Sequence, residues 1–424
     1  MSTPTRHSTL AQWLSWLSEQ HPQEIDLGLA RVGEVARRLD VCRPAPWVIT
    51  VAGTNGKGSS VAMLSAILQA QGFRVGMYTS PHLLRFNERV VIAGECVEDA
   101  ALVAAFCSIK QACQSISLTY FEYATLAALY LFKDRAVDVA VLEVGLGGRL
   151  DAVNIVDADA SLLTAIDIDH ADWLGSTREA IGFEKAGVMR AQRICVCSDP
   201  VPPQSVISYA QSLAVDLRCL GRDFSYSVRT HDWVFKDSGG EQAWPLPALK
   251  GAFQIQNAAG VLALLKAQSE LSVSDEAIRH GLTHIVHPGR LASYSLNQQA
   301  WLLDVAHNPQ SVQALAQFLA QQPTGERVAI FAVMADKDVT PMIALMRPFV
   351  SIWILPELAV PRAMSAHLLR EKLIGQGVDA SSIIVSEQMA QALKVAQSLA
   401  LDQGVVFGSF ITVAQALEAV SWMR

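Results

Sequence analysis

The residues best suited to chemistry lie where Val48-Ile-Thr-Val-Ala runs into Gly53-Thr-Asn-Gly-Lys-Gly-Ser59. The three glycines permit positive φ and a close approach of the backbone, so that successive N–H groups can point at an anion. Lys57 adds a positive charge for terminal phosphates, and the Ser59 hydroxyl suits Mg²⁺. The segment therefore predicts a phosphate-binding loop made of Gly53, Thr54, Asn55, Gly56, Lys57, Gly58 and Ser59.

The elements that must position this loop are an apolar strand before it and a helix after it. Residues 60–70 have the pattern of a helix whose N-terminal dipole would face the same anion. The spacing differs from that of the ordinary P-loop, because two residues separate Gly53 from Gly56 and Gly58 precedes Ser59. A glycine turn that merely ends a strand is the alternative, and the order of strand, loop and helix favours nucleotide binding.

Short apolar runs alternate with longer helical patterns along the chain, which predicts an α/β fold with mostly parallel sheets. The expected strands are Trp47–Ala52, Arg74–Thr79, Val137–Val144, Ala160–Ile166 and Arg193–Ser198, followed by Ala300–Val305, Arg327–Met334, Ser351–Leu355, Ser382–Val385 and Gly404–Gly408. A length of 424 residues favours two domains, which we expect at 1–289 and 290–424, with a short β-rich insertion near 219–250. Ligands of open α/β sheets bind at the carboxyl ends of the strands, where polar residues collect here.

The charge, the apolar runs and the cysteines of the chain limit the classes of partner and the cellular locations that we expect. A net charge of −7 argues against a nucleic-acid surface, which needs clustered Lys and Arg. No basic leader precedes an apolar run and no segment approaches 18 apolar residues, so we expect neither export nor membrane insertion, and a cytoplasmic location. The seven cysteines form no CxxC pair, which is typical of free thiols in a reducing compartment.

Several motifs together resemble those of the folylpolyglutamate synthases, relatives of the Mur ligases. The matching segments, in order, are Gly53–Ser59, Ser80–His82, Leu118–Tyr123, Glu143–Asp151, Asp169–His170, Glu184–Gly187, Pro288–Arg290, Asp304–Pro309 and Gly408–Phe410. The extra Gly58 favours the folate branch, and Asp26–Leu29 is similar to the bifunctional bacterial form, which also acts as dihydrofolate synthase. The resemblance implies a Mur-ligase-like P-loop ATPase domain and a smaller, Rossmann-like C-terminal domain.

A magnesium site is predicted beside the loop. Glu143 ends an apolar strand, where its carboxylate could join Ser59 and nucleotide oxygens around Mg²⁺. The resemblance adds Ser80 and His170 as metal ligands. The alternatives are a capping or surface role for Glu143 and a structural role for His170, since imidazole is a less usual partner of Mg²⁺ than a carboxylate.

The resemblance implies that Lys185 is carbamylated. A neutral amine can add CO₂ and become a carboxylate, which requires a lysine whose pKa is depressed by burial or by adjacent cations. An unmodified Lys185 would instead contact phosphate or form an exposed helix charge.

The resemblance also assigns residues to ATP and to L-glutamate. Asn257, Arg290 and Asp304 match ATP-binding positions and lie on both sides of the expected boundary, so a nucleotide between the domains is expected. His307 and Asn308 are candidates for binding glutamate, and a helix-start turn is the alternative for both.

A pterin pocket is the last site that the resemblance implies. Aromatic faces and a buried carboxylate suit a flat ring with exocyclic donors. Phe121 and Tyr123 could instead pack a helix start. The residues assigned to this pocket are Asp26, Leu27, Gly28, Leu29, Phe121, Glu122, Tyr123, Leu150 and Asp151.

The expected activity is that of an ATP- and Mg²⁺-dependent ligase, with a monovalent cation such as K⁺ as a further candidate cofactor. A carboxylate is a poor electrophile, so it would first be converted to an acyl phosphate and then attacked by the amine of L-glutamate. The expected acceptors are dihydropteroate and reduced folates, and a monomer is expected. The alternatives are a Mur-type ligase acting on a UDP-sugar peptide, a nucleotide switch, and an inactive relative.

Overall fold

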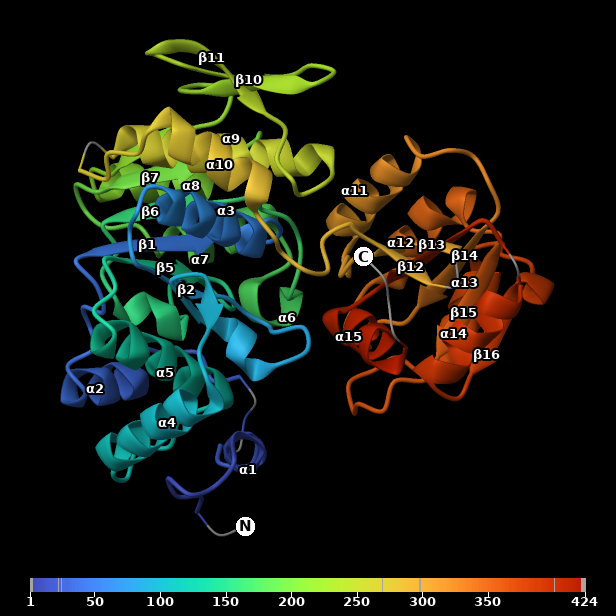
Figure 1. Cartoon of the computed structure of the whole chain (residues 1–424), viewed down its shortest axis with the longest axis horizontal. Coiled ribbons are helices and arrows are strands. Elements are labelled where there is room, and N and C mark those ends of the chain that lie inside the picture. The colour runs from blue at the N-terminus through green and yellow to red at the C-terminus, as the bar shows by residue number, and fades with distance from the viewer. Residues whose placement is uncertain are drawn as a thin grey trace. The chain divides into compact units, whose positions relative to one another are not determined.

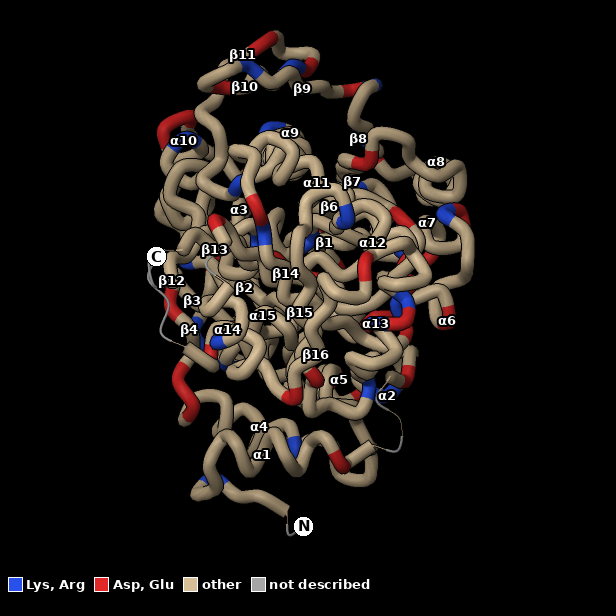
Figure 2. The backbone as a smooth tube through the Cα atoms, turned by 90° about the vertical axis from the view of Figure 1, so that its right-hand side faces the viewer, with Lys and Arg blue, Asp and Glu red and all other residues tan. Residues whose placement is uncertain are grey.

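The computed structural model describes residues 3–21, 23, 25–268, 270–296, 299–399 and 401–420. The chain divides into two compact units, Met1–Ala248 with Gln254–Val286 and Leu249–Phe253 with His287–Arg424. Acidic and basic residues are interspersed along the chain in both units (Figure 2). Over the described ranges, no helix is long and apolar enough to cross a membrane.

The first unit contains an eight-stranded sheet in the order β4-β3-β2-β5-β1-β6-β7-β8. The strands from β2 to β8 in this order run parallel, while β3 and β4 add an antiparallel edge. Parallel pairing brings the carboxyl ends of β2, β5, β1 and β6 to one edge of the sheet. The bounds are β1 Trp47–Ala52, β2 Val75–Tyr78, β3 Val90–Ile92, β4 Glu95–Cys96, β5 Val139–Glu143, β6 Ala160–Leu163, β7 Ile194–Cys197 and β8 Asp216–Cys219.

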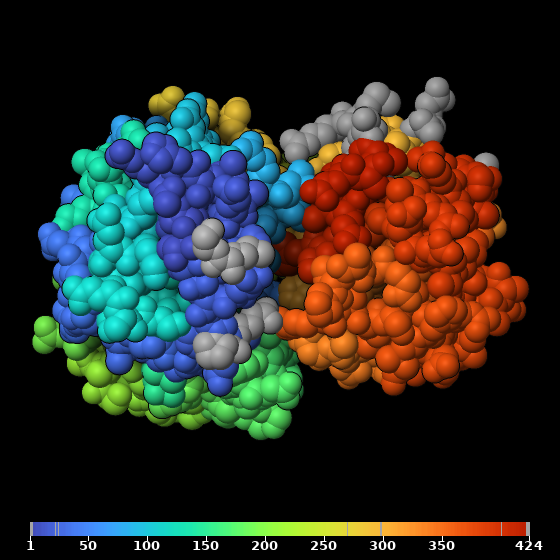
Figure 3. All heavy atoms as spheres, turned by 90° about the horizontal axis from the view of Figure 1, so that it is seen from below, coloured from blue at the N-terminus to red at the C-terminus, as the bar shows by residue number. Residues whose placement is uncertain are grey.

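Helices cover both faces of this sheet (Figure 1). On one face, α3 (Lys57–Ala70) packs on the central strands and against α10 (Asp275–His284). On the other face, α5 (Tyr120–Asp134) packs on β2, and α4 (Asp99–Cys113), α2 (Ala30–Arg38) and α1 (Leu10–Leu17) pack outside it. Figure 3 shows the blue N-terminal segment lying against the cyan surface of α4. The buried rings of Trp13, Trp16 and Phe106 join these outer helices.

The remaining elements of this unit are η1 Phe86–Arg89, η2 Ala152–Ile155, α6 Ala171–Leu174, α7 Arg178–Ala186, α8 Gln204–Ser212 and most of α9 Ala252–Ala267. Within the segment predicted to be β-rich, β9 (Ser225–Val228), β10 (Asp232–Asp237) and β11 (Gly240–Pro245) form an antiparallel three-stranded sheet. It lies on the outer side of α9 and α10, at the top of Figure 1.

The second unit contains a six-stranded sheet in the order β12-β13-β17-β14-β15-β16, in which only the β12–β13 pair is antiparallel. The stacked rings of Phe331 and Phe407 and the indole of Trp353 fill its core. The strands are β12 Ala292–Leu296, β13 Gln299–Leu303, β14 Arg327–Phe331, β15 Ile352–Pro356, β16 Ile383–Ser386 and β17 Gln403–Phe407. The helices are α11 Pro309–Leu319, α12 Val339–Met346, α13 Ala366–Gly375, α14 Met389–Ser398 and α15 Phe410–Ala419, with η3 Arg347–Phe349 and η4 Ala380–Ser382.

The predicted fold class is confirmed, and each of the ten expected strands overlaps an observed one. The sequence did not indicate β3, β4, β8 and β12, which are short and mostly at sheet edges. It also did not indicate that 249–253 belongs with the second unit. The boundary at residue 290 stays a prediction.

Candidate functional site

The loop between β1 and α3 is shaped by two glycines at which a side chain would meet both an unfavourable φ and a close neighbour. Gly56 has φ +96° and caps the N-terminus of α3. A Cβ on Gly56 would lie 2.4 Å from Asn257 Oδ1, and a Cβ on Gly53 would lie 1.8 Å from Thr164 Oγ1. The backbone of the loop is therefore pressed against its neighbours on both sides, with the N-terminus of a 14-residue helix directly behind it.

Two lysines converge on one carbonyl in this loop. Lys57 Nζ donates to Gly53 O and Thr54 O at 3.1 Å each, and Lys185 Nζ donates to Gly53 O at 2.8 Å. Lys185 is 3% exposed, near the C-terminal end of α7. Its pKa is lowered to about 7, first by burial and then by the charge of Lys57, against the opposing effects of Asp169 and Asp151. Lys185 therefore has the lowered amine pKa that carbamylation requires.

Helix α9 supports the other side of the loop. Gln254 Nε2 donates to Ser59 Oγ at 3.2 Å, and Asn257 Nδ2 donates to Gln254 Oε1 at 3.0 Å. All three side chains are buried. Asn257, which was predicted to bind ATP, therefore lies next to the loop. Gln254, which links it to Ser59, was not singled out from the sequence.

Ser80 and Glu143 meet at the next strand ends. Glu143 is the last residue of β5 and stands in register with Val51 of β1, so its carboxylate, which is 4% exposed, lies beside the loop. Ser80 follows β2, and its N–H donates to Glu143 Oε2 at 3.0 Å. The bond between Ser80 and Pro81 is cis. The two predicted metal ligands are therefore in direct contact.

His170 stands on the loop that follows β6, on the other side of β1. This loop is tied to the phosphate-loop candidate, because Thr54 N–H donates to Ala165 O at 2.7 Å and Thr54 Oγ1 donates to Asp167 O at 2.9 Å. His170 is partly exposed, has φ +52° and begins α6, and its N–H donates to Asp169 Oδ1 at 2.8 Å. Among the described residues, no three His, Cys, Asp or Glu side chains gather into a metal site.

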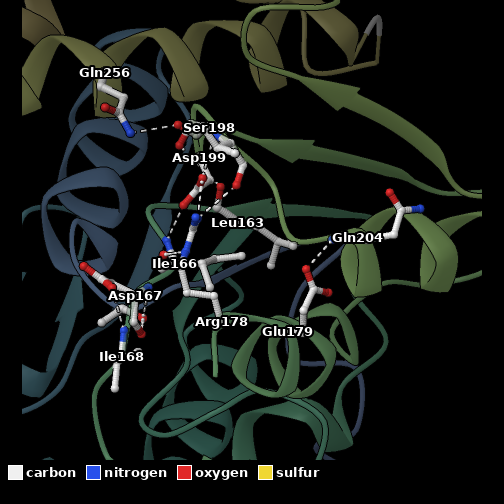
Figure 4. Close-up of polar contacts among 12 residues, drawn as sticks. Leu163, Ile166, Asp167, Ile168, Arg178, Glu179, Ser198, Asp199, Gln204 and Gln256 are labelled. Atoms are coloured by element: carbon white, nitrogen blue, oxygen red, sulfur yellow. Dashed lines mark hydrogen bonds and ion pairs between the residues drawn. The ribbon is translucent and has the colours of Figure 1, made fainter. Parts of the chain in front are cut away.

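An ion pair between buried Asp199 and partly exposed Arg178 fixes the loop that carries His170 (Figure 4). Asp199, which is 2% exposed, accepts from Ile166 N–H at 2.7 Å and from Arg178 Nη2 at 2.9 Å. Arg178 Nε also donates to Ile166 O at 2.9 Å, so the peptide of Ile166 is held from both sides. Arg178 begins α7 and Lys185 lies near its end. A single helix therefore positions the loop of His170 and the amine beside Gly53.

Asp151 organises the turn after Glu143. Its two carboxylate oxygens accept from the N–H groups of Leu146 (2.8 Å) and Val153 (2.9 Å), and it is 2% exposed. Burial raises its pKa to about 6, against the lowering effect of these hydrogen bonds and of Lys57. Because both oxygens are used by the backbone, Asp151 shapes the turn on which Leu150 is carried.

Two of the three expected pterin segments are joined by Arg31. Arg31 Nη1 lies 2.6 Å from Asp26 Oδ2, and its Nη2 lies 3.2 Å from Glu122 Oε1. Glu122 also closes the capping box of α5 with Thr119, and burial raises its pKa. Leu27, Gly28 and Leu29 are partly exposed next to this ion pair. The structure therefore brings 26–29 and 121–122 together around a residue that the sequence did not single out.

The aromatic pair of the predicted pocket separates into two roles. Phe121 is partly exposed and lies over the turn after β5, where a Cβ on Gly145 would be 2.5 Å from its ring. Tyr123 is 2% exposed, packs edge-on against Trp16 and Phe106, and its hydroxyl accepts from Cys113 Sγ at 3.6 Å. Tyr123 is therefore a core residue of the helix start, the alternative considered from the sequence, and only Phe121 faces the site.

The second unit gathers its candidates where β13 ends. Asp304 is 6% exposed and accepts from Leu291 N–H and Ala306 N–H at 2.8 Å each, and burial raises its pKa. The Arg290 guanidinium lies 5.0 Å from the centroid of Phe410, and the His307 ring lies 6.1 Å from it. Asn308 Oδ1 accepts from Ser311 N–H at 2.9 Å and caps α11, as the helix-start alternative required.

Known proteins match this chain over its whole length. The Mur ligase middle domain matches residues 51–265 and the Mur ligase glutamate ligase domain matches 289–410. The dihydrofolate synthase/folylpolyglutamate synthase of Escherichia coli is 44% identical over 100% of this chain and 98% of its own. The chain belongs to the dihydrofolate synthase/folylpolyglutamate synthase family. The predicted fold class and family are therefore confirmed, and so is the predicted enzyme class, an ATP-dependent amide ligase.

Solved structures of this family carry the expected ligands. Escherichia coli FolC in complex with DHPP and ADP has a TM-score of 0.92 and 43% identity, covering 98% of each chain. A bifunctional folylpolyglutamate synthase/dihydrofolate synthase with Mn, AMPPNP and L-glutamate bound has a TM-score of 0.90 and 42% identity, covering 99% of each chain. The ligands of these two proteins are of the kinds expected here, a nucleotide and a divalent metal ion.

Three residues of the site had no signal in the sequence, and a fourth, Asp199, had only an indirect one. Arg31, Arg178 and Gln254 act through contacts with distant segments, as Arg31 does with a residue 91 positions away. Asp199 directly follows the predicted strand Arg193–Ser198. The apolar strand before Asp199 was the one signal available, because it predicts a polar residue at the carboxyl edge of the sheet.

Proposed function

We propose that Gly53–Ser59 binds the phosphates of ATP and that Ser59, Ser80, Glu143 and His170 hold Mg²⁺ beside them. The residues fit both groups. Gly56 leaves the N-terminus of α3 open to an anion, and hydroxyl, carboxylate and imidazole groups stand on adjacent strand ends. With so few charged ligands, the coordination is completed by phosphate oxygens and water, as Mg²⁺ prefers. Asn257, Arg290 and Asp304 are the further nucleotide contacts that we propose.

The observation that carries this proposal is the convergence of Lys57 and Lys185 on the carbonyl of Gly53. The charge of Lys57 lies at the helix N-terminus, which favours an anion there, and the amine of Lys185 beside it is the group that CO₂ would modify. A lysine with a pKa of about 7 in such a place is typical of a functional site.

The enzyme adds L-glutamate to dihydropteroate, which gives dihydrofolate, and to reduced folates, which gives their polyglutamates. The acceptor carboxylate attacks the γ-phosphorus of ATP, forming an acyl phosphate and releasing ADP. The glutamate amine then attacks the acyl carbon, loses a proton, and displaces inorganic phosphate. Lys57 stabilises the charge on the transferred phosphoryl oxygens, and bound Mg²⁺ supplies further neutralisation of that charge. No protein nucleophile is required.

We propose that Lys185 is carbamylated in the active enzyme. The neutral amine adds CO₂ through its lone pair and loses one proton, which leaves an N-linked carboxylate. The like-charge contact with Lys57 then becomes an ion pair. Supplying carbon-13 bicarbonate should give a carbamate NMR signal that is absent from Lys185→Met, and a wild-type spectrum without that signal would refute the modification.

We propose that the pterin lies against Phe121, with Leu27, Leu29 and Leu150 as apolar neighbours and Asp26 as a polar contact. Gly28 allows close approach, Glu122 holds Arg31, and Asp151 keeps the turn in shape. In the second unit, His307 is our candidate for contacting glutamate, and Asn308 positions it by capping α11. A monomeric, cytoplasmic enzyme with only small-molecule substrates stays our prediction.

The test of the proposed function is incubation with ATP, Mg²⁺ and L-glutamate plus either dihydropteroate or tetrahydrofolate. We expect products heavier by one glutamyl residue in both reactions, with one ADP formed for each bond. A product only with a UDP-muramyl acceptor, or ADP release that does not depend on glutamate, would contradict it.

A further inference from the structure

Arg89 is a buried cation that forms no ion pair with an acidic residue among those that the structure describes. It ends η1 and is 8% exposed. The adjacent Glu88 does not neutralise it, because its oxygens accept from the N–H groups of Leu83, Leu84 and Arg85 at 2.7, 2.9 and 2.8 Å. A buried charge is costly unless it is paired, so this guanidinium requires an explanation.

The surroundings of Arg89 are neutral and hold it in one orientation. Its Nε donates to His82 Nδ1 at 2.8 Å, which leaves the proton of the neutral ring on Nε2. The guanidinium carbon lies 5.5 Å from the centroid of Phe86 and 5.7 Å from that of Tyr120. These rings offset part of the desolvation cost, but a cation–π contact does not neutralise charge.

Contacts of Arg89 lead to the proposed metal ligands on one side and to the proposed ring-binding residue on the other. Its carbonyl accepts from Thr79 N–H at 3.0 Å, and the next residue, Ser80, donates to Glu143. Its guanidinium also acts on the buried Tyr78 hydroxyl, whose pKa is raised by burial and lowered by Arg89. The Tyr78 ring lies 6.2 Å from Phe121. A ligand that reaches from Phe121 toward Glu143 would therefore pass Arg89.

We propose that Arg89 binds the carboxylate of the pteroate acceptor and presents it for phosphorylation, with His82 holding the guanidinium. The inference deepens the proposed function and depends on it. A planar guanidinium is suited to pair with a carboxylate through two parallel hydrogen bonds. A carboxylate could also come from L-glutamate, and the two sources are separated by the experiment below.

The test is a binding cycle that changes the enzyme and the ligand separately. Dissociation constants are measured for dihydropteroate and for its carboxamide, with Mg²⁺ and AMPPNP present, on wild type, Arg89→Met and Arg89→Lys. Wild type should prefer the acid by about tenfold to a hundredfold, as expected for hydrogen bonds to a charged group. Arg89→Met should bind acid and amide equally, and Arg89→Lys should fall between them.

The matched control is Arg85→Met. Arg85 belongs to the same turn, but its side chain is 71% exposed and pairs with Asp99, so this variant should keep the wild-type preference. The preference between acid and amide would not change if Arg89 served only to hold the loop. If Arg89→Met is too unstable to assay, the same dissociation constants are measured on Arg89→Lys and His82→Gln.

Three outcomes decide the proposal. Loss of acid preference in Arg89→Met, with an unchanged KM for glutamate, supports it. An acid preference that survives in Arg89→Met overturns it, and so does a raised KM for glutamate with the preference intact, which would assign the guanidinium to the amino acid. Failure of wild type to bind either acceptor would instead reject the proposed function.

Discussion

The carboxyl edges of the two sheets use their polar side chains differently. In the first unit, the side chains of Lys57 and Lys185 both donate to one carbonyl oxygen, which places the charge of Lys57 beside a helix N-terminus. In the second unit, Asp304 and Asn308 accept from backbone N–H groups and hold the chain in shape. The difference is what we expect if the first edge receives an anion, as we propose, while the second is held in shape by hydrogen bonds to its own backbone.

The largest effect is expected from Lys57→Ala, which removes charge from the first edge. Turnover should fall by about a thousandfold, because one donor to the developing charge is lost from a preorganised site. The far-ultraviolet circular dichroism should not change. Lys394→Ala, on the exposed face of α14, is the control and should retain full activity. Near-normal turnover of Lys57→Ala would remove the phosphate-loop assignment.

Glu143→Gln tests whether the carboxylate at the first edge binds Mg²⁺, because it removes the negative charge and keeps the shape of the side chain. The Mg²⁺ concentration for half-maximal rate should rise by about tenfold to a hundredfold, since a charged ligand is replaced by a weak one. Glu95→Gln, on the exposed edge strand β4, should leave the Mg²⁺ dependence unchanged. Unaltered Mg²⁺ dependence in Glu143→Gln would exclude it as a ligand.

Arg178→Met tests whether α7 positions the metal site indirectly. The loop of His170 would lose the clamp shown in Figure 4, and we expect about a tenfold rise in the Mg²⁺ requirement. The free energy of unfolding should fall by about 2 kcal/mol, because buried Asp199 loses a charged donor. Arg222→Met, which breaks an exposed pair with Asp223, is the control. A loss of stability without any change in Mg²⁺ dependence would make the clamp purely structural.

The pH dependence of stability tests the electrostatics of the first edge. Lys185 has a pKa of about 7 when folded and 10.5 as its ordinary value, so the unfolded chain binds more protons between these limits. Stability should therefore rise with pH above about 7 by up to ~1.4 kcal/mol per unit relative to Lys185→Met. The measurement is chemical denaturation in CO₂-free buffers from pH 6 to pH 10. Parallel curves for the two proteins would show that Lys185 titrates normally.

The smallest effect is expected at the second edge. Asn308→Ala should cost about 1 kcal/mol of stability through loss of the cap on α11, and Asn308→Asp should cost little, because aspartate also caps. If Asn308 acts through the helix start, Asn308→Asp should keep a normal KM for glutamate. A large rise in that KM for Asn308→Asp would make it a ligand contact.

The sequence was most informative where local chemistry decides structure. Buried parallel strands are continuous apolar runs, so β1 was predicted with its observed bounds, and β15 and β17 were predicted to within one residue at each end. Glu95–Cys96 is too short and exposed to leave such a pattern. Glu143 could be predicted as a site residue because a carboxylate after an apolar strand must lie at the ligand edge.

Contacts between distant segments could not be predicted. Arg31, Arg89 and Arg178 belong to no local sequence pattern. The role of each depends on the residues that the fold places beside it. Tyr123 shows the converse, because its type and motif suggested a ligand while packing made it part of the core. Motifs identify the chemistry of a loop, whereas the residues that hold the loop in place depend on tertiary structure.

The most direct test of the central claim is a crystal structure of this protein with Mg²⁺ and AMPPNP. We expect the triphosphate along Gly53–Ser59, with Lys57 turned onto it, and the metal ion in contact with Glu143 and with at least one of Ser80 and His170. A triphosphate bound elsewhere, or a metal ion that touches none of these three side chains, would contradict the account.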